Sequence, residues 1–551
     1  MKHKNQQDFW FLVLLAGCFL FCLWRTPFGN PSWDETSYLA MMHRFWLGDI
    51  PILQEWHPTQ FSAILTLPVY SAYLAIHGSS DGIVLFMRYL FLIAQTLTAI
   101  FLYYRIRQYG WISILCALLL FLTAKNEMYS LNYNGLGLIL AILTAVLLYL
   151  KGKHQKLETY LAGICFAGLS LCTPHMALLY VLGSFVLLIK REAFSEERSS
   201  WWYFSFGILT IAGIFAVFFL SKGNVVEYAA AIPELFKGAD HSSSLKTGLV
   251  QYLALGKMVL MNSIFTMLGV PAFAILLFLS WKKRGTKKAE NIYLPIGLLL
   301  TLILLIGYQF GNNYSMIAFV PLGMLCLILD QNADRRLKKF FLFGIGYMLM
   351  MNLSSNTILN GVQFASTVCM VPSLIEAAQM IPARKKRAKA LLCCCTIVML
   401  CMDLVHKMTY CYVDESPFHI HAVYEGKGPM RGICSTEENI SSYEELQTVW
   451  NQSIEGHENV MIYSLNRWLY LELIPGQHVA SHTIWLKSSG ESDLNSLARY
   501  YHEHPERTPD YVMVPYRAES DLQDLTAFLS PYGLVPEQTA AGVIFEKGEQ
   551  E

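Results

Sequence analysis

Two adjacent acids, Asp34 and Glu35, follow a tryptophan in an aromatic-rich stretch just after the first apolar segment of the chain. A carboxylate held near the depth of a bilayer loses part of its hydration, so its pKa rises toward the working pH and it can accept a proton from a hydroxyl group. The run from Ser32 to Glu35 also fits an S-x-x-E capping box, in which Glu35 only starts a helix. Asp34 would be redundant as a cap. We therefore expect Asp34 to act as a general base and Glu35 to support it.

The composition indicates that these acids belong to a polytopic membrane protein. Of 551 residues, 54% are hydrophobic and 13% aromatic, which is too apolar for an ordinary soluble enzyme. Residues 1–405 carry 32 basic and 19 acidic side chains, a net charge of +13, whereas residues 406–551 carry 9 and 22, a net charge of −13. We predict a transmembrane catalytic domain over 1–405 and a separate extracytoplasmic domain over 406–551.

Basic clusters fall in every second loop between the apolar runs, and such clusters stay in the cytoplasm. The runs are near the length needed to cross the hydrocarbon layer and predict about thirteen transmembrane helices, with the N-terminus inside and the C-terminal domain outside. The run 61–76 would break this alternation, so we interpret it as a juxtamembrane or re-entrant helix. The predicted spans are roughly 9–25, 83–104, 111–124, 134–150, 158–172, 175–189, 203–220, 257–280, 292–309, 315–329, 340–352, 361–381 and 390–405.

The outer loops are the longer and more polar ones, and long loops on one face usually carry function. In the first of them, Tyr38, Met42, Phe45 and Trp46 recur at i, i+4, i+7 and i+8 after the acids. This spacing predicts an amphipathic helix in the membrane interface with its aromatic side toward lipid. The segment 226–236 has a similar pattern and predicts a second interfacial helix.

Arg88 lies within about two helical turns of the outer end of its predicted span, where a charged side chain is costly unless it pairs or reaches the interface. Its guanidinium is a planar fork of donors suited to phosphodiester oxygens. The alternative is that Arg88 only extends to the lipid headgroups. The chain has no phosphate-binding glycine loop of the G-x-x-x-x-G-K-[ST] or G-x-G-x-x-G type. A reaction at the outer face with a lipid-borne substrate is therefore favoured over nucleotide chemistry.

Three stretches of the first outer loop resemble the GT-C superfamily of membrane glycosyltransferases, which includes protein O-mannosyltransferases and lipid A aminoarabinose transferases. They are N-P-S-W-D-E-x-x-Y-L at 30–39, G-D-I-P at 48–51 and E-W-H-P-T at 55–59. The resemblance continues through G-x-x-D-x-x-x-x-x-x-R at 78–88 and covers roughly residues 1–150. In that superfamily an acidic motif sits in the first outer loop, and the donor is a sugar on a polyprenyl phosphate.

The resemblance implies a role for each matching residue. Asp34 activates the acceptor hydroxyl with support from Glu35, and the turn at His57 helps to form the site. Arg88 binds the donor phosphate, with Lys125 and His57 as further candidates. The residues that are candidates to line the site are Tyr38, Glu127, Asn134 and His175.

Asn134 marks a departure from the superfamily pattern, because related enzymes often carry an acid in this region. This leaves Glu127 as the only nearby acid, so no metal site is predicted, although a divalent metal stays open as a cofactor. Lys125 could equally be an interfacial anchor. His175, at the mouth of a predicted span, is more commonly structural than functional. His57 is better placed because it shares the acidic loop.

Thirteen cysteines are present, and eleven of them fall in apolar runs as small hydrophobic residues. Only Cys411 and Cys434 lie in the C-terminal domain, where a disulfide is left open by the sequence. That domain alternates short strands and helices, which favours a small α/β sheet covered by helices. The predicted strands are 432–435, 460–463, 511–514 and 542–545, and the predicted helices are 443–450, 494–502 and 521–528.

The acidity of the C-terminal domain argues against nucleic acid as a partner. Its aromatics either fill a core, which we favour, or stack on sugar rings, in keeping with an accessory role in acceptor recognition. They are Trp468, Tyr470, Trp485, Tyr500 and Tyr501.

The sequence thus predicts a multi-pass glycosyltransferase of the plasma (inner) membrane. It would move a sugar from a polyprenyl-phosphate donor to a hydroxyl acceptor, which is a cell-envelope glycan, a glycolipid or a protein. The alternatives are a transporter or flippase of lipid-linked sugars, which would place its site near the midplane, and an envelope polysaccharide polymerase.

Overall fold

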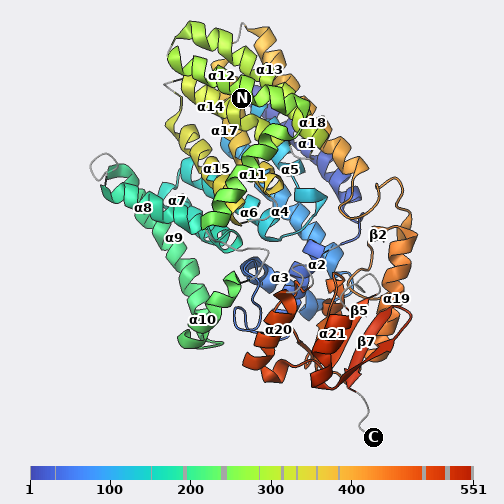
Figure 1. Ribbon diagram of the computed structural model, residues 1–551. Helices are drawn as coiled ribbons and strands as arrows, with labels where there is room; N and C mark the ends of the chain where they lie inside the picture. Colours follow the sequence, from blue (N-terminus) through green and yellow to red (C-terminus); the bar gives the residue numbers. More distant parts are fainter. Residues whose placement is uncertain are drawn as a thin grey trace.

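The computed structural model describes residues 2–31, 33–150, 152–189, 195–237, 245–284, 286–311, 315–330, 333–354, 358–382, 385–486, 492–515 and 522–547. Figure 1 shows a large helical body and a smaller C-terminal lobe, residues 410–547, which contains a β-sheet. The described chain begins in the helical body at residue 2 and ends in the lobe at residue 547.

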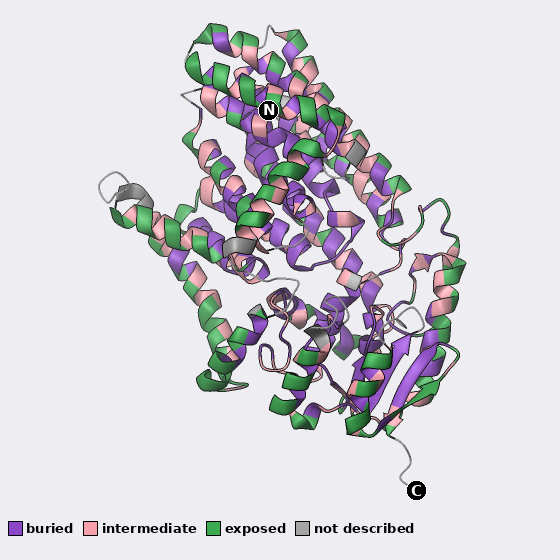
Figure 2. Cartoon of the chain, in the orientation of Figure 1, coloured by how far each residue is buried: buried purple, intermediate pink, exposed green. Residues whose placement is uncertain are grey.

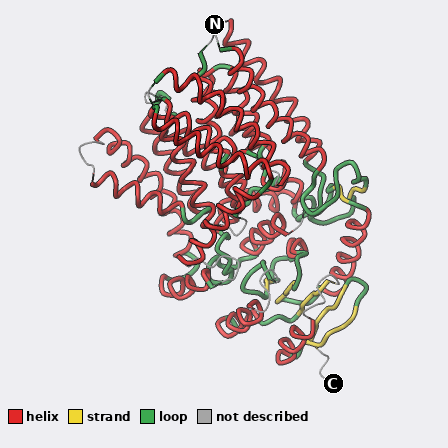
Figure 3. Tube along the Cα trace, turned by 45° about the horizontal axis from the view of Figure 1, so that its top comes forward, coloured by secondary structure: helices red, strands yellow, loops and turns green. Residues whose placement is uncertain are grey.

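The helical body contains eighteen α-helices among the described residues, and several of them run alongside one another in Figure 3. The helices are α1 Lys2–Arg25, α2 Trp33–Trp46, α3 Phe61–His77, α4 Ile83–Ile106, α5 Trp111–Leu122, α6 Tyr133–Tyr149, α7 Gln155–Cys172, α8 Met176–Ile189, α9 Ser195–Leu220, α10 Val225–Ala231, α11 Leu245–Met261, α12 Ile264–Lys282, α13 Lys287–Gly311, α14 Phe319–Leu329, α15 Arg335–Ser354, α16 Leu359–Ala365, α17 Thr367–Met380 and α18 Lys386–Thr409. Short 3₁₀ turns include η2 Lys125–Glu127 and η3 Ile232–Phe236.

The helices that can cross a membrane are fewer than the sequence predicts. Among the described residues, six helices are long and apolar enough, namely α1, α4, α9, α12, α13 and α18. The pair α16 and α17 makes a seventh if this element, bent by 46°, is one span. The protein is a helical membrane protein, but the prediction of thirteen crossings is wrong. The remaining predicted spans are helices that are too short or too polar to pass the same test, α5 with 12 residues among them.

Burial separates the lipid-facing helices from the interior ones. Only 17% of the most apolar window is buried in α1 and in α9, so both expose large apolar side chains such as Leu20 and Val217. Ten of the twelve residues of α5, by contrast, are buried by other helices. Figure 2 shows the same contrast, with exposed residues on the outer helices and buried residues in the centre. The apolar residues of α5 therefore form protein core.

α2 is a helix as predicted, but its aromatic side does not face lipid. Tyr38 and Met42 are each 1% exposed, and Phe45 is buried as well. The helix packs between α3 and the 3₁₀ turn η6, Arg467–Glu472, of the C-terminal lobe. Figure 1 shows α2 and α3 at the junction between the helical body and the lobe. The prediction of a lipid-facing helix is wrong because protein covers both sides of it.

The second predicted interfacial helix, 226–236, forms α10 followed by η3. Asn224 caps α10, because its side chain accepts hydrogen bonds from the backbone of Val226 and Glu227. Tyr228 packs inward, whereas Val225 and Val226 are exposed. The side chain of Phe236, which the pattern used, is outside the described residues.

The C-terminal lobe is an α/β unit whose five-stranded sheet has the order β4-β3-β5-β7-β6. β3 pairs in parallel with β4 and β5, and β7 is antiparallel to β5 and β6, with Met513 opposite Ile544. The strands are β3 Asn459–Ile462, β4 His478–Val479, β5 Tyr511–Pro515, β6 Leu534–Gln538 and β7 Gly542–Lys547, and the helices are α19 Glu437–Ser453, α20 Ser492–Glu503 and α21 Leu522–Leu529. The predicted strands near 460, 511 and 542 and all three helices are therefore present.

One predicted strand belongs elsewhere. Residues 432–435 contribute β2, Cys434–Ser435, which pairs with β1, Ala422–Val423, in a separate two-stranded sheet. β2 also contacts the segment before α2, because Gly29 N donates to Cys434 O at 2.9 Å and Cys434 N donates to Pro27 O at 2.9 Å. Cys411 and Cys434 are both free thiols. Backbone hydrogen bonds therefore join the first loop to β2 of the lobe.

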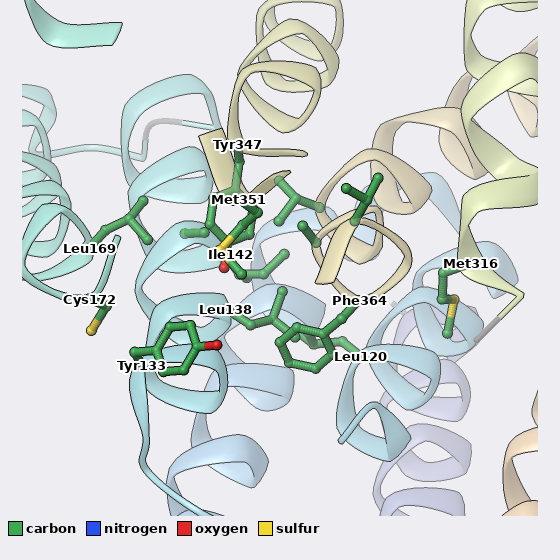
Figure 4. Close-up of a cluster of buried hydrophobic side chains, with 14 of the residues drawn as sticks. Leu120, Tyr133, Leu138, Ile142, Leu169, Cys172, Met316, Tyr347, Met351 and Phe364 are labelled. Carbon is green, nitrogen blue, oxygen red and sulfur yellow. The ribbon is translucent and has the colours of Figure 1, made fainter. Parts of the chain in front are cut away.

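A continuous apolar core runs through the helical body and across the junction into the C-terminal lobe. Figure 4 shows Leu138 and Ile142 of α6 facing Tyr347 and Met351 of α15 within this core. Tyr133, at the first residue of α6, lies at the edge of the same cluster. The core therefore supports the beginning of α6, next to which the candidate site is built.

Candidate active site

The start of α2 is held by a buried ion pair between two residues that the sequence singled out. Arg88 of α4 donates from Nε to Glu35 Oε1 and from Nη2 to Glu35 Oε2, both at 2.8 Å, and each side chain is 5% exposed. The guanidinium also donates to the backbone oxygens of Thr26 and Gly29 at 3.0 Å each. Two-point pairing of this kind is among the stronger charged interactions in proteins. Arg88 therefore ties the segment before α2 to the first turn of that helix.

This geometry contradicts the prediction for Arg88 and the helix-cap alternative for Glu35. Arg88 does not present its donors to a donor phosphate, because the Glu35 carboxylate and backbone oxygens take up its fork. Glu35 is not merely a helix cap, because both of its oxygens bind Arg88. Ser32, the other half of the expected capping box, lies outside the described residues. The two residues together hold the backbone on either side of Asp34.

Asp34 lies in the first turn of α2 and is only partly buried. The positive end of the helix dipole favours a negative charge at this place. Asp34 is close to two tyrosines, Tyr38 one turn further along α2 and Tyr412 beyond the end of α18. Burial first, and then the charge of Asp34, raises the pKa of Tyr412 to about 12. Asp34 is thus an accessible carboxylate beside phenols that stay neutral.

Tyr38 and His57 are joined through a threonine. The Tyr38 hydroxyl and Thr59 Oγ1 are 2.8 Å apart, and Thr59 Oγ1 is 2.7 Å from His57 Nδ1. Burial, the neighbouring Tyr133 and Asp34 raise the pKa of Tyr38 well above its usual range. His57 and Tyr38 therefore lie together, and Asp34 is a neighbour of Tyr38.

Lys125 and Asn134 reach the same group from the other side. Lys125 Nζ donates to Asn134 Oδ1 at 3.3 Å and lies 5.7 Å from the centre of the Tyr133 ring, which is 5.8 Å from the ring of Tyr38. Asn134 Nδ2 is buried and makes no hydrogen bond within the described ranges. Lys125 and the Nδ2 donor of Asn134 therefore lie side by side in a buried place, where an anionic oxygen of a ligand could accept hydrogen bonds from both.

Glu127 is drawn into a different ion pair. Its Oε2 is 2.5 Å from Lys407 Nζ of α18, and the two side chains are 4% and 1% exposed. Glu127 is also in the left-handed backbone region, with a φ of 55°. Lys407 was not among the candidate residues identified from the sequence. The available signal was its place just after the last apolar run, four residues beyond Asp403. Glu127 therefore joins α18 to the second loop, and the structure gives it no direct contact with Asp34.

His175 also lies apart from the group. Its Nδ1 is 2.7 Å from Ser354 Oγ at the end of α15. This hydrogen bond joins the turn before α8 to α15. It is the one side-chain hydrogen bond of His175 among the described residues, and it supports a structural role for this histidine.

The C-terminal lobe supplies two residues that sequence reasoning assigned elsewhere or missed. Trp485 stacks on His57 at 4.9 Å between ring centres and meets the edge of Tyr38 at 5.8 Å. Arg467, which is fully buried, lies 4.6 Å above the Trp485 ring and donates from Nη1 to Ser37 Oγ at 2.9 Å. Trp485 is therefore not simply part of the lobe's core, whereas the other four predicted core aromatics are buried there.

A second buried charge cluster holds the far end of α2. Arg44 pairs with Asp49 at 2.6 Å and with Glu55 at 3.0 Å, and Arg507 of the lobe pairs with Asp49 at 2.9 Å. Burial opposes ionisation of Asp49, but the two guanidiniums outweigh it and lower its pKa. Glu55 also accepts from the backbone N–H of His57 at 3.0 Å. The cluster orients the His57 turn and joins the first loop to the lobe.

The site therefore lies where the helical body meets the lobe. It contains the partly exposed carboxylate of Asp34, the imidazole of His57, the buried amine of Lys125 and the Asn134 Nδ2 donor. These groups can accept a proton from a hydroxyl and stabilise an anion that leaves on the opposite side. Among the described residues, no three His, Cys, Asp or Glu side chains gather as a metal site. No protein-family model and no curated protein matches this chain, so the geometry carries the functional argument.

Proposed function

We propose that this protein is a GT-C-like glycosyltransferase that moves a sugar from a polyprenyl-phosphate donor to a hydroxyl acceptor at the outer face of the plasma membrane. The observation that carries the proposal is the placement of Asp34. It lies in the first turn of α2, beside Glu35, which is paired with Arg88. Its neighbour Tyr38 is joined to His57 through Thr59, and the Tyr38 ring lies beside that of Tyr133, which Lys125 contacts.

In the proposed reaction, Asp34 accepts the proton of the acceptor hydroxyl as its oxygen forms a bond to the anomeric carbon of the donor sugar. The bond between that carbon and the phosphate oxygen breaks, and the polyprenyl phosphate leaves with the electron pair. A single base and a good leaving group suffice for one displacement, which inverts the anomeric centre. Lys125 Nζ and Asn134 Nδ2 stabilise the departing phosphate.

The buried ion pair has a supporting role in this scheme. Arg88 and Glu35 hold the backbone on both sides of Asp34, so the carboxylate keeps its position without contacting the substrate. Catalytic groups must be held within a fraction of an ångström for good rates. The Trp485 and Arg467 contacts serve the same purpose from the lobe.

An enzyme is favoured over a transporter by where the acid lies. Transporters place their sites near the bilayer midplane, often on broken helices. Asp34 and its partners instead lie in the connections between apolar helices, beside the C-terminal lobe. A polymerase of lipid-linked oligosaccharides would use the same chemistry with a larger donor.

The test supplies purified full-length protein in lipid vesicles with radiolabelled polyprenyl-phosphate sugar and candidate acceptors. The unaltered protein should transfer the label, and Asp34→Asn should lower the rate by about 10²–10⁴-fold, the usual contribution of a general base. The matched control Asp524→Asn alters an exposed acid on α21 and should leave the rate unchanged. Movement of lipid across the bilayer without sugar transfer, or full transfer by Asp34→Asn, would overturn the proposal.

A further inference from the structure

A cavity of about 250 Å³ lies in the C-terminal lobe next to the first loop. Its walls come from five parts of the chain: the loop residue Asn30, the segment 424–435, one side of α19, η6 with the residue before it, and the residues Pro515 and Ala541 at β5 and β7. It is distinct from the group around Asp34, because Asp34, His57 and Lys125 do not line it. We call it the junction cavity.

The lining of the junction cavity is polar but almost uncharged. Side-chain amides come from Asn30, Asn439 and Asn466, and hydroxyls come from Ser435 and Ser442. None of the residues that line it is lysine, arginine or histidine, and its one acid is Glu445, which is exposed at the edge. Amides present both donors and acceptors, and hydroxyls do the same. Such a lining matches a ligand rich in hydroxyl groups and does not match a phosphate.

One wall is aromatic. Trp468, Tyr443 and Tyr424 are buried and line the cavity, with 4.0 Å between the ring centres of Trp468 and Tyr443. An aromatic surface beside polar groups suits sugars, because the carbon-bound hydrogens of a pyranose ring are apolar while its rim carries hydroxyls. The volume is close to the lower bound of about 300 Å³ for small-molecule pockets, which corresponds to a small saccharide.

Some polar groups of the lining are hydrogen-bonded to other protein groups, and others have no such hydrogen bond among the described residues. Asp414 accepts from the backbone N–H of Asn30 and from Ser435 Oγ, both at 2.6 Å, and Asn439 Nδ2 donates to Ser435 Oγ at 3.0 Å. Within the described ranges, the side-chain amides of Asn30 and Asn466 make no hydrogen bond to the protein, so they remain for a ligand. The cavity thus combines a rigid frame with unused donors and acceptors.

The position of the cavity relates it to the reaction. Asn30 stands four residues before Asp34, and its loop is hydrogen-bonded to β2 of the lobe. Resting on the proposed function, we propose that the junction cavity binds a neutral sugar unit of the acceptor, so that the acceptor is a glycan rather than a protein side chain alone. The bound unit would orient the acceptor hydroxyl toward Asp34.

Binding can be measured without turnover. Full-length protein in detergent is mixed with neutral trisaccharides of glucose, mannose, galactose and N-acetylglucosamine, and saturation-transfer NMR reports which of them binds. We expect at least one to bind, and we expect Asn466→Ala to weaken it about tenfold by removing hydrogen bonds. Ser442→Phe should abolish binding by filling the cavity. The matched control Asn451→Ala, on the exposed side of α19, should bind normally.

Failure of this inference and failure of the proposed function give different results. If no trisaccharide binds, if binding survives both cavity variants, or if glucose 6-phosphate binds better than every neutral sugar, the sugar site is overturned whatever the activity. With the glycan acceptor, Asn466→Ala should raise KM about tenfold and leave kcat within about twofold, as expected for loss of ground-state binding. Asp34→Asn should bind the trisaccharide normally, so its transfer rate tests the proposed function alone.

Discussion

Arg88 and Glu35 form a buried two-point salt bridge, with Nε to Oε1 and Nη2 to Oε2 both at 2.8 Å. The two residues come from different helices, α4 and α2, and the same guanidinium also binds backbone oxygens of the segment that leads into Asp34. The pair therefore constrains the first loop on both sides of the proposed base. We first predict how much this pair contributes to the free energy of unfolding.

Replacing Arg88 with methionine should destabilise the protein strongly. Removing one partner of a buried pair leaves the other as an uncompensated charge, which costs about 3–5 kcal/mol. Thermal unfolding in detergent should show a clearly lowered Tm, and sugar transfer should fall because Asp34 loses its support. Arg107→Gln is the control, since the pair of Arg107 with Asp8 is partly exposed and such pairs contribute about 0–1 kcal/mol. Equal effects of the two variants would contradict the assignment.

The Glu127 and Lys407 pair should show strong energetic coupling. Lys407→Met or Glu127→Gln alone should lower the stability by about 3–5 kcal/mol, because each leaves a buried group without its partner. The double variant should recover much of the loss, since no buried charge is left unpaired. The measurement is a double-mutant cycle from the unfolding transitions of the four proteins. Additive losses would mean that the 2.5 Å contact does not hold the loop to α18.

Arg467 tests whether the C-terminal lobe positions the first loop. Arg467→Ala removes the hydrogen bond to Ser37 and the contact with the Trp485 ring, so α2 should lose its alignment. A misplacement of this kind can lower kcat by about 10²-fold. Arg467→Lys keeps the charge but not the planar fork of donors, so its kcat should lie between those of the unaltered protein and Arg467→Ala. Arg499→Ala removes an exposed side chain that pairs with Glu234 and, among the described residues, makes no contact with Trp485 or Ser37, so it should have unaltered kcat. A purely structural role would lower Tm in Arg467→Ala and leave the kcat of the folded fraction unchanged.

The stability of the lobe should fall as the pH rises through about 7 because of Glu472. Burial first, and then the charge of Asp81, raises the pKa of Glu472 from 4.5 to about 7, although Gln447 donates to it at 2.7 Å. A carboxyl whose pKa is higher in the folded than in the unfolded state contributes stability that is complete below pH 4.5 and lost above pH 7. This contribution is on the order of 3 kcal/mol.

The check compares unfolding at pH 5 and pH 8. Glu472→Gln cannot ionise, so the difference in stability between the two pH values should be smaller than in the unaltered protein. Glu444→Gln, on the exposed side of α19, should keep the original difference. If both variants show the same pH dependence as the unaltered protein, Glu472 does not titrate in this range.

Short-range patterns located much of the secondary structure. The strands near 460, 511 and 542 were predicted because each is a compact run of apolar residues bounded by polar ones. β4 was not predicted, since two residues make no pattern, and neither was β6, whose residues are mostly exposed at the sheet edge. Pairing with neighbouring strands stabilises both, and pairing is a property of the folded chain.

The predicted number of transmembrane helices was wrong for a related reason. Hydropathy measures how apolar a helix is, but not whether lipid or protein covers it. α5 is as apolar as a membrane span and is nevertheless a 12-residue helix buried by other helices. α2 likewise has the periodicity of an interfacial helix, yet α3 and the lobe cover its aromatic side. What covers a helix is decided by packing between distant segments.

The sequence by itself determined that this is a helical membrane protein with an acidic α/β lobe, and it identified Asp34, His57 and Lys125 as candidates for chemistry. Composition, charge and local spacing suffice for that. Only the tertiary structure paired Glu35 with Arg88, 53 residues away, and Glu127 with Lys407, 280 residues away. Burial makes each of these charges depend on its partner, and partners so distant in sequence meet only when the helices pack.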